Sequence, residues 1–135
     1  MSVETVTLGT TTYLAGEEDV VESFRLDGEP VADVADGLRA ATATPRNRLS
    51  RRRSFSFLVK RAPAASPADC RLAIIQHEIE LSQAEQDGEK DVVWSYRGIG
   101  YVLRDVVVKH SSEQRGVTSY HTYTGTFGAL ETSSL

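Results

Sequence analysis

The feature that most constrains the fold of this chain is the alternation of apolar and polar residues in short runs. In the clearest run, residues 54–61, Phe55, Phe57 and Val59 fall on one face of an extended chain. Such alternation predicts a β-strand with one buried face. Runs rich in Val, Thr and aromatic residues also cover residues 3–14, 20–26, 92–96, 101–109 and 117–127. The chain is therefore expected to be mainly β.

One segment between these runs has the pattern of an α-helix. Ser66 can cap the first turn, Pro67 suits the first helical position, and Asp69 completes a weak capping box. Apolar residues then recur at helical spacing, at Ala68, Leu72, Ile75 and Ile79. These signals predict a helix from Ser66 to the low 80s with this apolar face against the core. A strand over the second half is the alternative, because Ile75, His77, Ile79 and Leu81 also alternate.

The order of elements, several strands, one helix and then three more strands, predicts the fold class. It is an antiparallel β-sandwich or a partly closed barrel with one flanking α-helix. A length of 135 residues fits a single domain over residues 1–135. The polar run 110–116 is expected to be a turn, and Gly98-Ile99-Gly100 a bend between strands. The predicted core consists of Phe55, Phe57, Val59, Leu72, Ile75, Ile79, Val93, Val102 and Val106.

Charge is distributed unevenly although the net charge is only −4. Residues 1–44 hold nine acidic side chains, whereas residues 45–61 hold seven basic side chains and no acid. Opposite blocks of this kind attract each other within a subunit or between copies. We therefore expect residues 40–53 to form an exposed basic loop that contacts a neighbouring subunit. The alternatives are a loop that is only solvated and a loop that contacts nucleic-acid phosphates. Its interface residues would be Arg46, Arg48, Arg51, Arg52 and Arg53.

No combination of residues indicates catalysis, a cofactor or a metal ion. The three histidines are expected in different settings, His77 on the helix, His110 in a turn and His121 in a strand, and are not expected to converge. Cys70 is the one cysteine, which excludes an intramolecular disulfide. The sequence therefore predicts a protein that is not an enzyme, with no catalytic residues, no cofactor and no metal.

Membrane and secretion signals are also missing from the sequence. No apolar run approaches 18 residues, and the first residues do not combine a basic region with an apolar segment. We expect no membrane partner and no signal peptide.

The order of these segments resembles a family of assembly proteins. The run Arg53–Val59, the capped helix, the run Val92–Tyr96 and the closing strand rich in Gly, Thr and Tyr resemble the helix-flanked β-sandwich of bacteriophage tail proteins. Tail tube, tail terminator and distal-tail subunits share this architecture. The resemblance covers roughly residues 50–130.

The resemblance implies a structural subunit of a phage virion tail or a related ring or tube. Such proteins associate with copies of themselves and with other virion proteins through sheet edges, an extended loop and terminal arms. Here the corresponding segments would be residues 1–14 as an assembly arm, the loop 40–53, and the tail 131–135. The expected location is the virion, and the host cytoplasm during assembly. The alternative function is a small nucleic-acid-binding β-barrel that uses the basic loop from Arg46 to Arg53.

Overall fold

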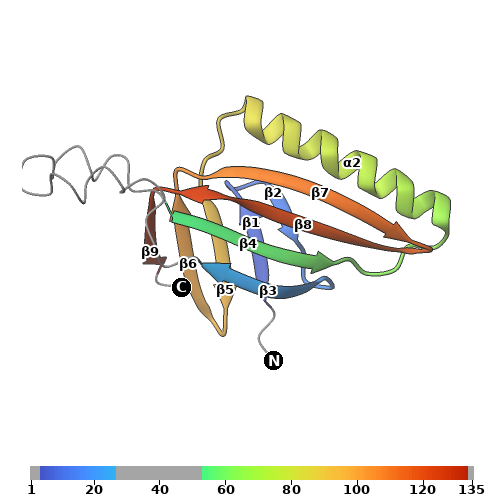
Figure 1. Cartoon of the computed structure of the whole chain (residues 1–135), viewed down its shortest axis with the longest axis horizontal. Helices are drawn as coiled ribbons and strands as arrows, with labels where there is room; N and C mark the ends of the chain where they lie inside the picture. Colours follow the sequence, from blue (N-terminus) through green and yellow to red (C-terminus); the bar gives the residue numbers. More distant parts are fainter. Residues whose placement is uncertain (1–3, 27–52, 134–135) are drawn as a thin grey trace, which may run out of the picture.

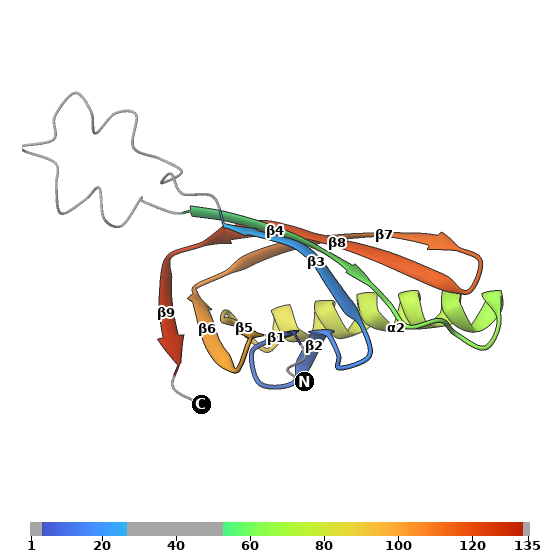
Figure 2. The ribbon, with the colours of Figure 1, turned by 90° about the horizontal axis from the view of Figure 1, so that it is seen from below.

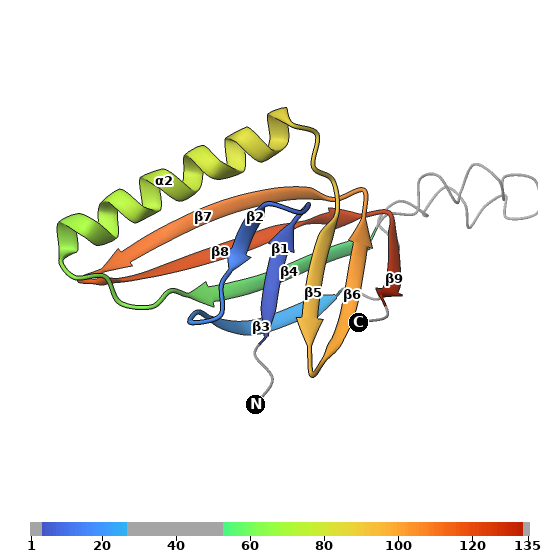
Figure 3. The same cartoon turned by 180° about the vertical axis from the view of Figure 1, so that it is seen from behind.

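The computed structural model describes residues 4–26 and 53–133 of the chain. These residues form nine strands and one long helix (Figures 1 and 3). The elements in chain order are β1 (Thr5–Leu8), β2 (Thr12–Ala15), β3 (Val20–Leu26), β4 (Arg53–Lys60), α2 (Pro67–Gln86), β5 (Val92–Tyr96), β6 (Ile99–Arg104), β7 (Val107–Arg115), β8 (Thr118–Phe127) and β9 (Ala129–Ser133).

The strands build two antiparallel sheets that face each other as a sandwich. One sheet has the order β2-β1-β5-β6-β9 and the other the order β3-β4-β8-β7. The sheets do not close into a barrel. Of the two predicted alternatives, the antiparallel β-sandwich with one flanking helix is therefore confirmed, and the partly closed barrel is not. Figure 2 shows α2 on the same side of the four-stranded sheet as β1 and β2. The helix thus extends the second layer beneath β7 and β8.

The core lies between the inner faces of the two sheets. Phe55, Phe57 and Val59 are buried on β4, as the alternation predicted. Val102 and Val106 are also buried, whereas Val93 is only partly covered. A column of stacked rings connects the layers, with Phe57 between Tyr123 at 4.8 Å and Phe24 at 5.0 Å. Phe24 in turn stacks on Trp94 at 3.9 Å.

The helix is present as predicted, and residues 75–81 are not a strand. Ser66 is its N-cap, where the hydroxyl accepts a hydrogen bond from the main-chain N–H of Asp69 at 3.1 Å. The predicted burial of its apolar face is wrong, because the helix buries Cys70, His77 and Ala84 instead. The side chains expected in the core point outward and are about half exposed: Leu72 (55%), Ile75 (48%) and Ile79 (57%). Leu81, on the same side of the helix, is partly buried and packs against the core.

The predicted turn at residues 110–116 is also wrong. These residues continue β7 as far as Arg115, and the chain reverses at Gly116, whose φ is +63°. The break that the sequence did not reveal is at Asp105, which has φ +55° and separates β6 from β7. The bend predicted around Gly98 is confirmed, since Arg97 and Gly98 form a tight turn with positive φ between β5 and β6.

Most of the expected N-terminal arm, residues 4–14, belongs to the sandwich of this chain. β1 pairs with both β2 and β5 in this chain's own sheet, and Val6 and Leu14 are fully buried. Residues 4–14 are therefore ordered within this chain, and a role of residues 1–14 in assembly stays a prediction. In the expected C-terminal arm, residues up to Ser133 belong to β9, which pairs with β6. Among the described residues, no helix is apolar enough over sufficient length to span a membrane.

Candidate functional site

The predicted basic interface falls mostly outside the described residues. Arg46, Arg48, Arg51 and Arg52 belong to that part of the chain. Arg53 begins β4, and its guanidinium carbon lies 5.5 Å from the centre of the Phe127 ring. Within the acidic block, Asp19 binds Arg61 of the same chain at 2.6 Å. The contact between this block and the basic loop remains a prediction.

The outward face of α2 exposes three large aliphatic side chains. We call Leu72, Ile75 and Ile79 the aliphatic stripe. Their spacing places them on one side of the helix, opposite the side that carries His77. In Figure 1, α2 lies beside β7, at one flank of the four-stranded sheet, while β3 lies at the other flank. The stripe therefore faces away from the sandwich.

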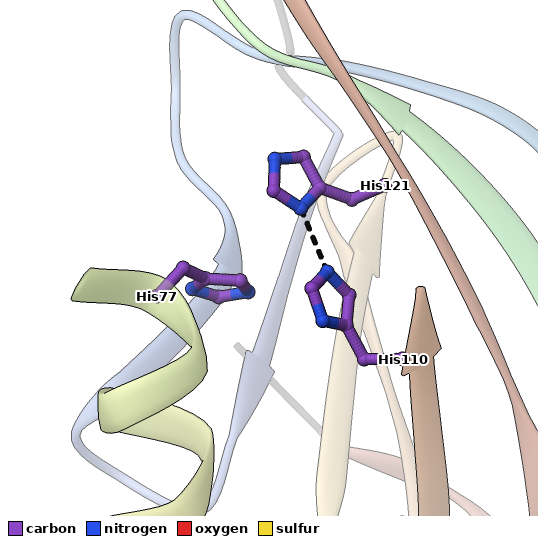
Figure 4. A group of neighbouring side chains, drawn as sticks. All are labelled: His77, His110 and His121. Carbon is purple, nitrogen blue, oxygen red and sulfur yellow. Dashed lines mark hydrogen bonds between the residues drawn. The ribbon is translucent and has the colours of Figure 1, made fainter. Parts of the chain in front are cut away.

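The interior beneath α2 holds a second feature, the histidine cluster of His77, His110 and His121. The residues come from α2, β7 and β8, and one ring nitrogen of each lies within 4.8 Å of the others. Figure 4 shows the three rings turned toward a common space. The expectation that the histidines do not converge is wrong.

The topology explains this convergence. In the β7–β8 hairpin, His110 is opposite Tyr123 and Ser112 is opposite His121, so the two histidines are diagonal neighbours on the inner face. His77 is the central residue of the buried face of α2, which packs over this hairpin. The sequence gives little signal for this, because residues 109–115 are all polar and show no apolar alternation although β7 continues to Arg115.

Hydrogen bonds connect two of the rings to each other and to two oxygen groups. His110 Nε2 and His121 Nδ1 are 2.7 Å apart (Figure 4). The other nitrogen of His110, Nδ1, donates to the carboxylate of Glu78. The other nitrogen of His121, Nε2, lies 3.0 Å from the hydroxyl of Ser119. Each nitrogen in this series of hydrogen bonds has one role, donor or acceptor, when Ser119 donates to His121 and His121 donates to His110.

His77 has a different set of partners. The Tyr123 phenol donates to the main-chain carbonyl of Leu14 at 3.2 Å, so His77 Nε2 donates to the phenol at 2.6 Å. The guanidinium of Arg61 lies 3.2 Å from the same ring nitrogen. The carboxylate of Asp19 accepts a hydrogen bond from the Arg61 guanidinium at 2.6 Å and compensates its positive charge. It also accepts hydrogen bonds from two main-chain N–H groups.

Burial keeps all three imidazoles neutral at neutral pH. It lowers the pKa of His77 to about 3 and that of His121 to about 4, and the positive charge of Arg61 acts in the same direction. Burial also lowers the pKa of His110, although Glu78 opposes this shift. Burial raises the pKa of the Tyr123 phenol, which stays protonated. Neutral imidazoles keep the nitrogen lone pairs that bind a metal ion or accept a proton.

Two cavities reach the histidine cluster from different sides. One, of about 610 Å³, is lined by His77, Ser119 and His121, together with Asp19 and Arg61. The other, of about 370 Å³, is lined by Glu78, His110 and apolar residues of β7. The buried thiol of Cys70 borders the first cavity. A small ion or a water molecule therefore has a route to the three rings.

In comparisons with known proteins, no family model, no curated protein and no solved structure matches this chain.

Proposed function

We propose that this protein is a non-enzymatic structural subunit that assembles with copies of itself, as in a phage tail or a related ring or tube. The observation that carries the proposal is the aliphatic stripe on α2. The helix turns Leu72, Ile75 and Ile79 to the surface, whereas the residues that it buries are Cys70, His77 and Ala84. A helix of an isolated domain normally has the opposite arrangement. The helix-flanked sandwich is also the architecture that the resemblance to tail proteins implies.

Covering the stripe by another subunit would stabilise the assembly. Full burial of one large aliphatic side chain is worth about 1.5–3 kcal/mol. Since each member of the stripe is already about half buried, its remaining surface contributes about 1 kcal/mol. The three together supply about 3 kcal/mol, which is a useful part of an interface and too little for a complete one.

The opposite flank offers a second surface for the same assembly. Within the described chain, β3 pairs only with β4, so its outer edge faces no other described strand. Val20 on this strand is 51% exposed. Two different surfaces on opposite flanks permit a head-to-tail contact, and repeated head-to-tail contacts close into a ring. The stripe of one copy meeting the β3 flank of the next is the arrangement that we propose.

The test compares one stripe variant with a matched control. Ile75→Glu places a charge in the middle of the stripe, and Thr122→Glu places the same charge on an exposed residue of β8, on the face of the sheet opposite to buried His121 and Tyr123. Light scattering coupled to size-exclusion chromatography should show oligomers for the parent and for Thr122→Glu, and monomers for Ile75→Glu. Circular dichroism verifies that both variants are folded. A monomeric parent, or a folded Ile75→Glu variant that still assembles like the parent, contradicts the proposal.

A further inference from the structure

We propose that His77, His110 and His121 bind one divalent transition-metal ion, with Zn²⁺ as the best representative of the class. Three separate elements bring one imidazole each to a shared space, and one ring nitrogen of each lies within 4.8 Å of the others. Imidazole nitrogen is a preferred ligand of Zn²⁺, and three protein ligands leave a fourth position for water. The site is independent of the proposed assembly.

The spacing of the nitrogens suits such an ion. His110 Nε2 and His121 Nδ1 face each other at 2.7 Å. In a tetrahedral zinc site with Zn–N bonds of about 2.0–2.1 Å, two ligand nitrogens are about 3.3 Å apart. The two rings would separate by roughly 0.6 Å to admit the ion. His77 would move toward them, because its ring centre lies 5.2 Å from that of His110 and 5.4 Å from that of His121.

Each ring has an oxygen group beside its other nitrogen, which is the usual support for a ligating histidine. The carboxylate of Glu78 accepts from His110 Nδ1, and the Ser119 hydroxyl lies 3.0 Å from His121 Nε2. A serine hydroxyl accepts as readily as it donates, so His121 can carry its proton on Nε2 when Nδ1 binds the ion. For His77, the carboxylate of Glu80 lies 3.6 Å from Nδ1.

Two groups near the site oppose or compete with the ion. The Arg61 guanidinium repels a cation, but Asp19 compensates its charge. The Tyr123 phenol occupies His77 Nε2, and the ion would displace it. The phenol keeps a partner because it already donates to the carbonyl of Leu14. Removal of the phenol alone therefore should not weaken metal binding.

The expected consequence of binding is a clamp between α2 and the β7–β8 hairpin. An ion that binds the folded chain and not the unfolded chain raises the melting temperature by mass action. The clamp would restrict the motion of the same helix that carries the aliphatic stripe. Neutral imidazoles favour this role, since no proton has to be removed from a charged ring at pH 7.

The experiment titrates the full chain, stripped with a chelator, with Zn²⁺ by calorimetry and with Co²⁺ by visible absorption. We expect one ion per chain, Co²⁺ bands typical of a four-coordinate ion with three nitrogen ligands and one water, and a higher melting temperature. His110→Ala should abolish binding. Glu78→Gln should weaken it about 10- to 100-fold, because the carboxylate orients a ligand. Glu85→Gln on the same helix, and Tyr123→Phe, should bind at least as tightly as the parent.

Glu78 is the main test residue because its side chain is 54% exposed, so Glu78→Gln should fold even if a buried histidine variant does not. Absence of one-to-one binding by the folded parent overturns the proposal. Binding that survives His110→Ala in a folded variant overturns it as well. If the three histidines form only a structural hydrogen-bonded cluster, the folded parent will not bind one metal ion per chain. Neither result affects the proposed assembly, which is measured without added metal.

Discussion

The column of stacked rings makes Phe57→Ala the most informative test of the sandwich core. Phe57 is 2% exposed and lies between the rings of Tyr123 and Phe24, at 4.8 and 5.0 Å. Burial of a phenylalanine side chain is worth about 1.5–3 kcal/mol, and each favourable aromatic pair adds about 0.5–1.5 kcal/mol. Two pairs and the burial together predict a loss of about 4 kcal/mol in the free energy of unfolding. This value agrees with the range of about 3–5 kcal/mol typical of Phe→Ala in protein cores.

The assay is urea unfolding followed by the fluorescence of Trp94, at equal protein concentration for every variant. The control is Tyr13→Ala, which removes an aromatic ring that is 61% exposed on β2. The control should change the free energy of unfolding by less than about 1 kcal/mol. A Phe57→Ala variant within about half a kcal/mol of the parent would show that the inner face of β4 has been assigned incorrectly, since no buried ring can be removed at so small a cost.

Three further predictions concern the hairpin and the buried cluster. Gly125→Ala should destabilise the fold by about 3 kcal/mol or more in urea unfolding, because an added Cβ would lie 1.8 Å from a main-chain carbonyl oxygen of β7. Asp19→Ala should cost about 3 kcal/mol in the same assay, since it leaves Arg61 uncompensated beside His77; an unchanged midpoint would show that the pair is unimportant. In chelator-treated protein, stability should fall as the pH drops from 7 to 5, because folded His77 and His121 have pKa values of about 3 and about 4 while unfolded histidine titrates near 6.5. A stability that is flat over this range, where carboxylates remain ionised, would refute the buried neutral rings.

Local patterns in the sequence predicted where most elements lie. Alternation identified β4 and β8, and Ser66 with Pro67 located the start of α2. These signals depend on neighbouring residues only, so they can be recognised without knowledge of the fold. The boundary between β6 and β7 was missed, because the charged pair Arg104-Asp105 between apolar residues fits a continuous strand as well as the break that the positive φ of Asp105 makes.

The orientation of α2 could not be predicted in the same way. Helical spacing shows that Leu72, Ile75 and Ile79 share a face, but not what that face contacts. Assigning it to the core assumed that one chain buries its own apolar residues. The exposed stripe is the departure from that assumption, and it is the surface that we propose for assembly.

The histidine cluster escaped sequence reasoning for a related reason. His77 is 33 residues from His110, so only the packing of α2 on the hairpin brings them together. His110 and His121 were within reach, because an uninterrupted hairpin that turns at Gly116 places both on one face. The turn assigned to residues 110–116 concealed that relation.

Electron microscopy of the purified full chain tests the central claim, self-assembly of a structural subunit, most directly. The account predicts rings or tubes of uniform diameter at high protein concentration and low salt, where the attraction between charged blocks of neighbouring subunits is least screened. Their abundance should fall when Ile75→Glu replaces the parent and should not change for Thr122→Glu. Particles that remain monomers of 14.8 kDa at every concentration and salt would contradict the account.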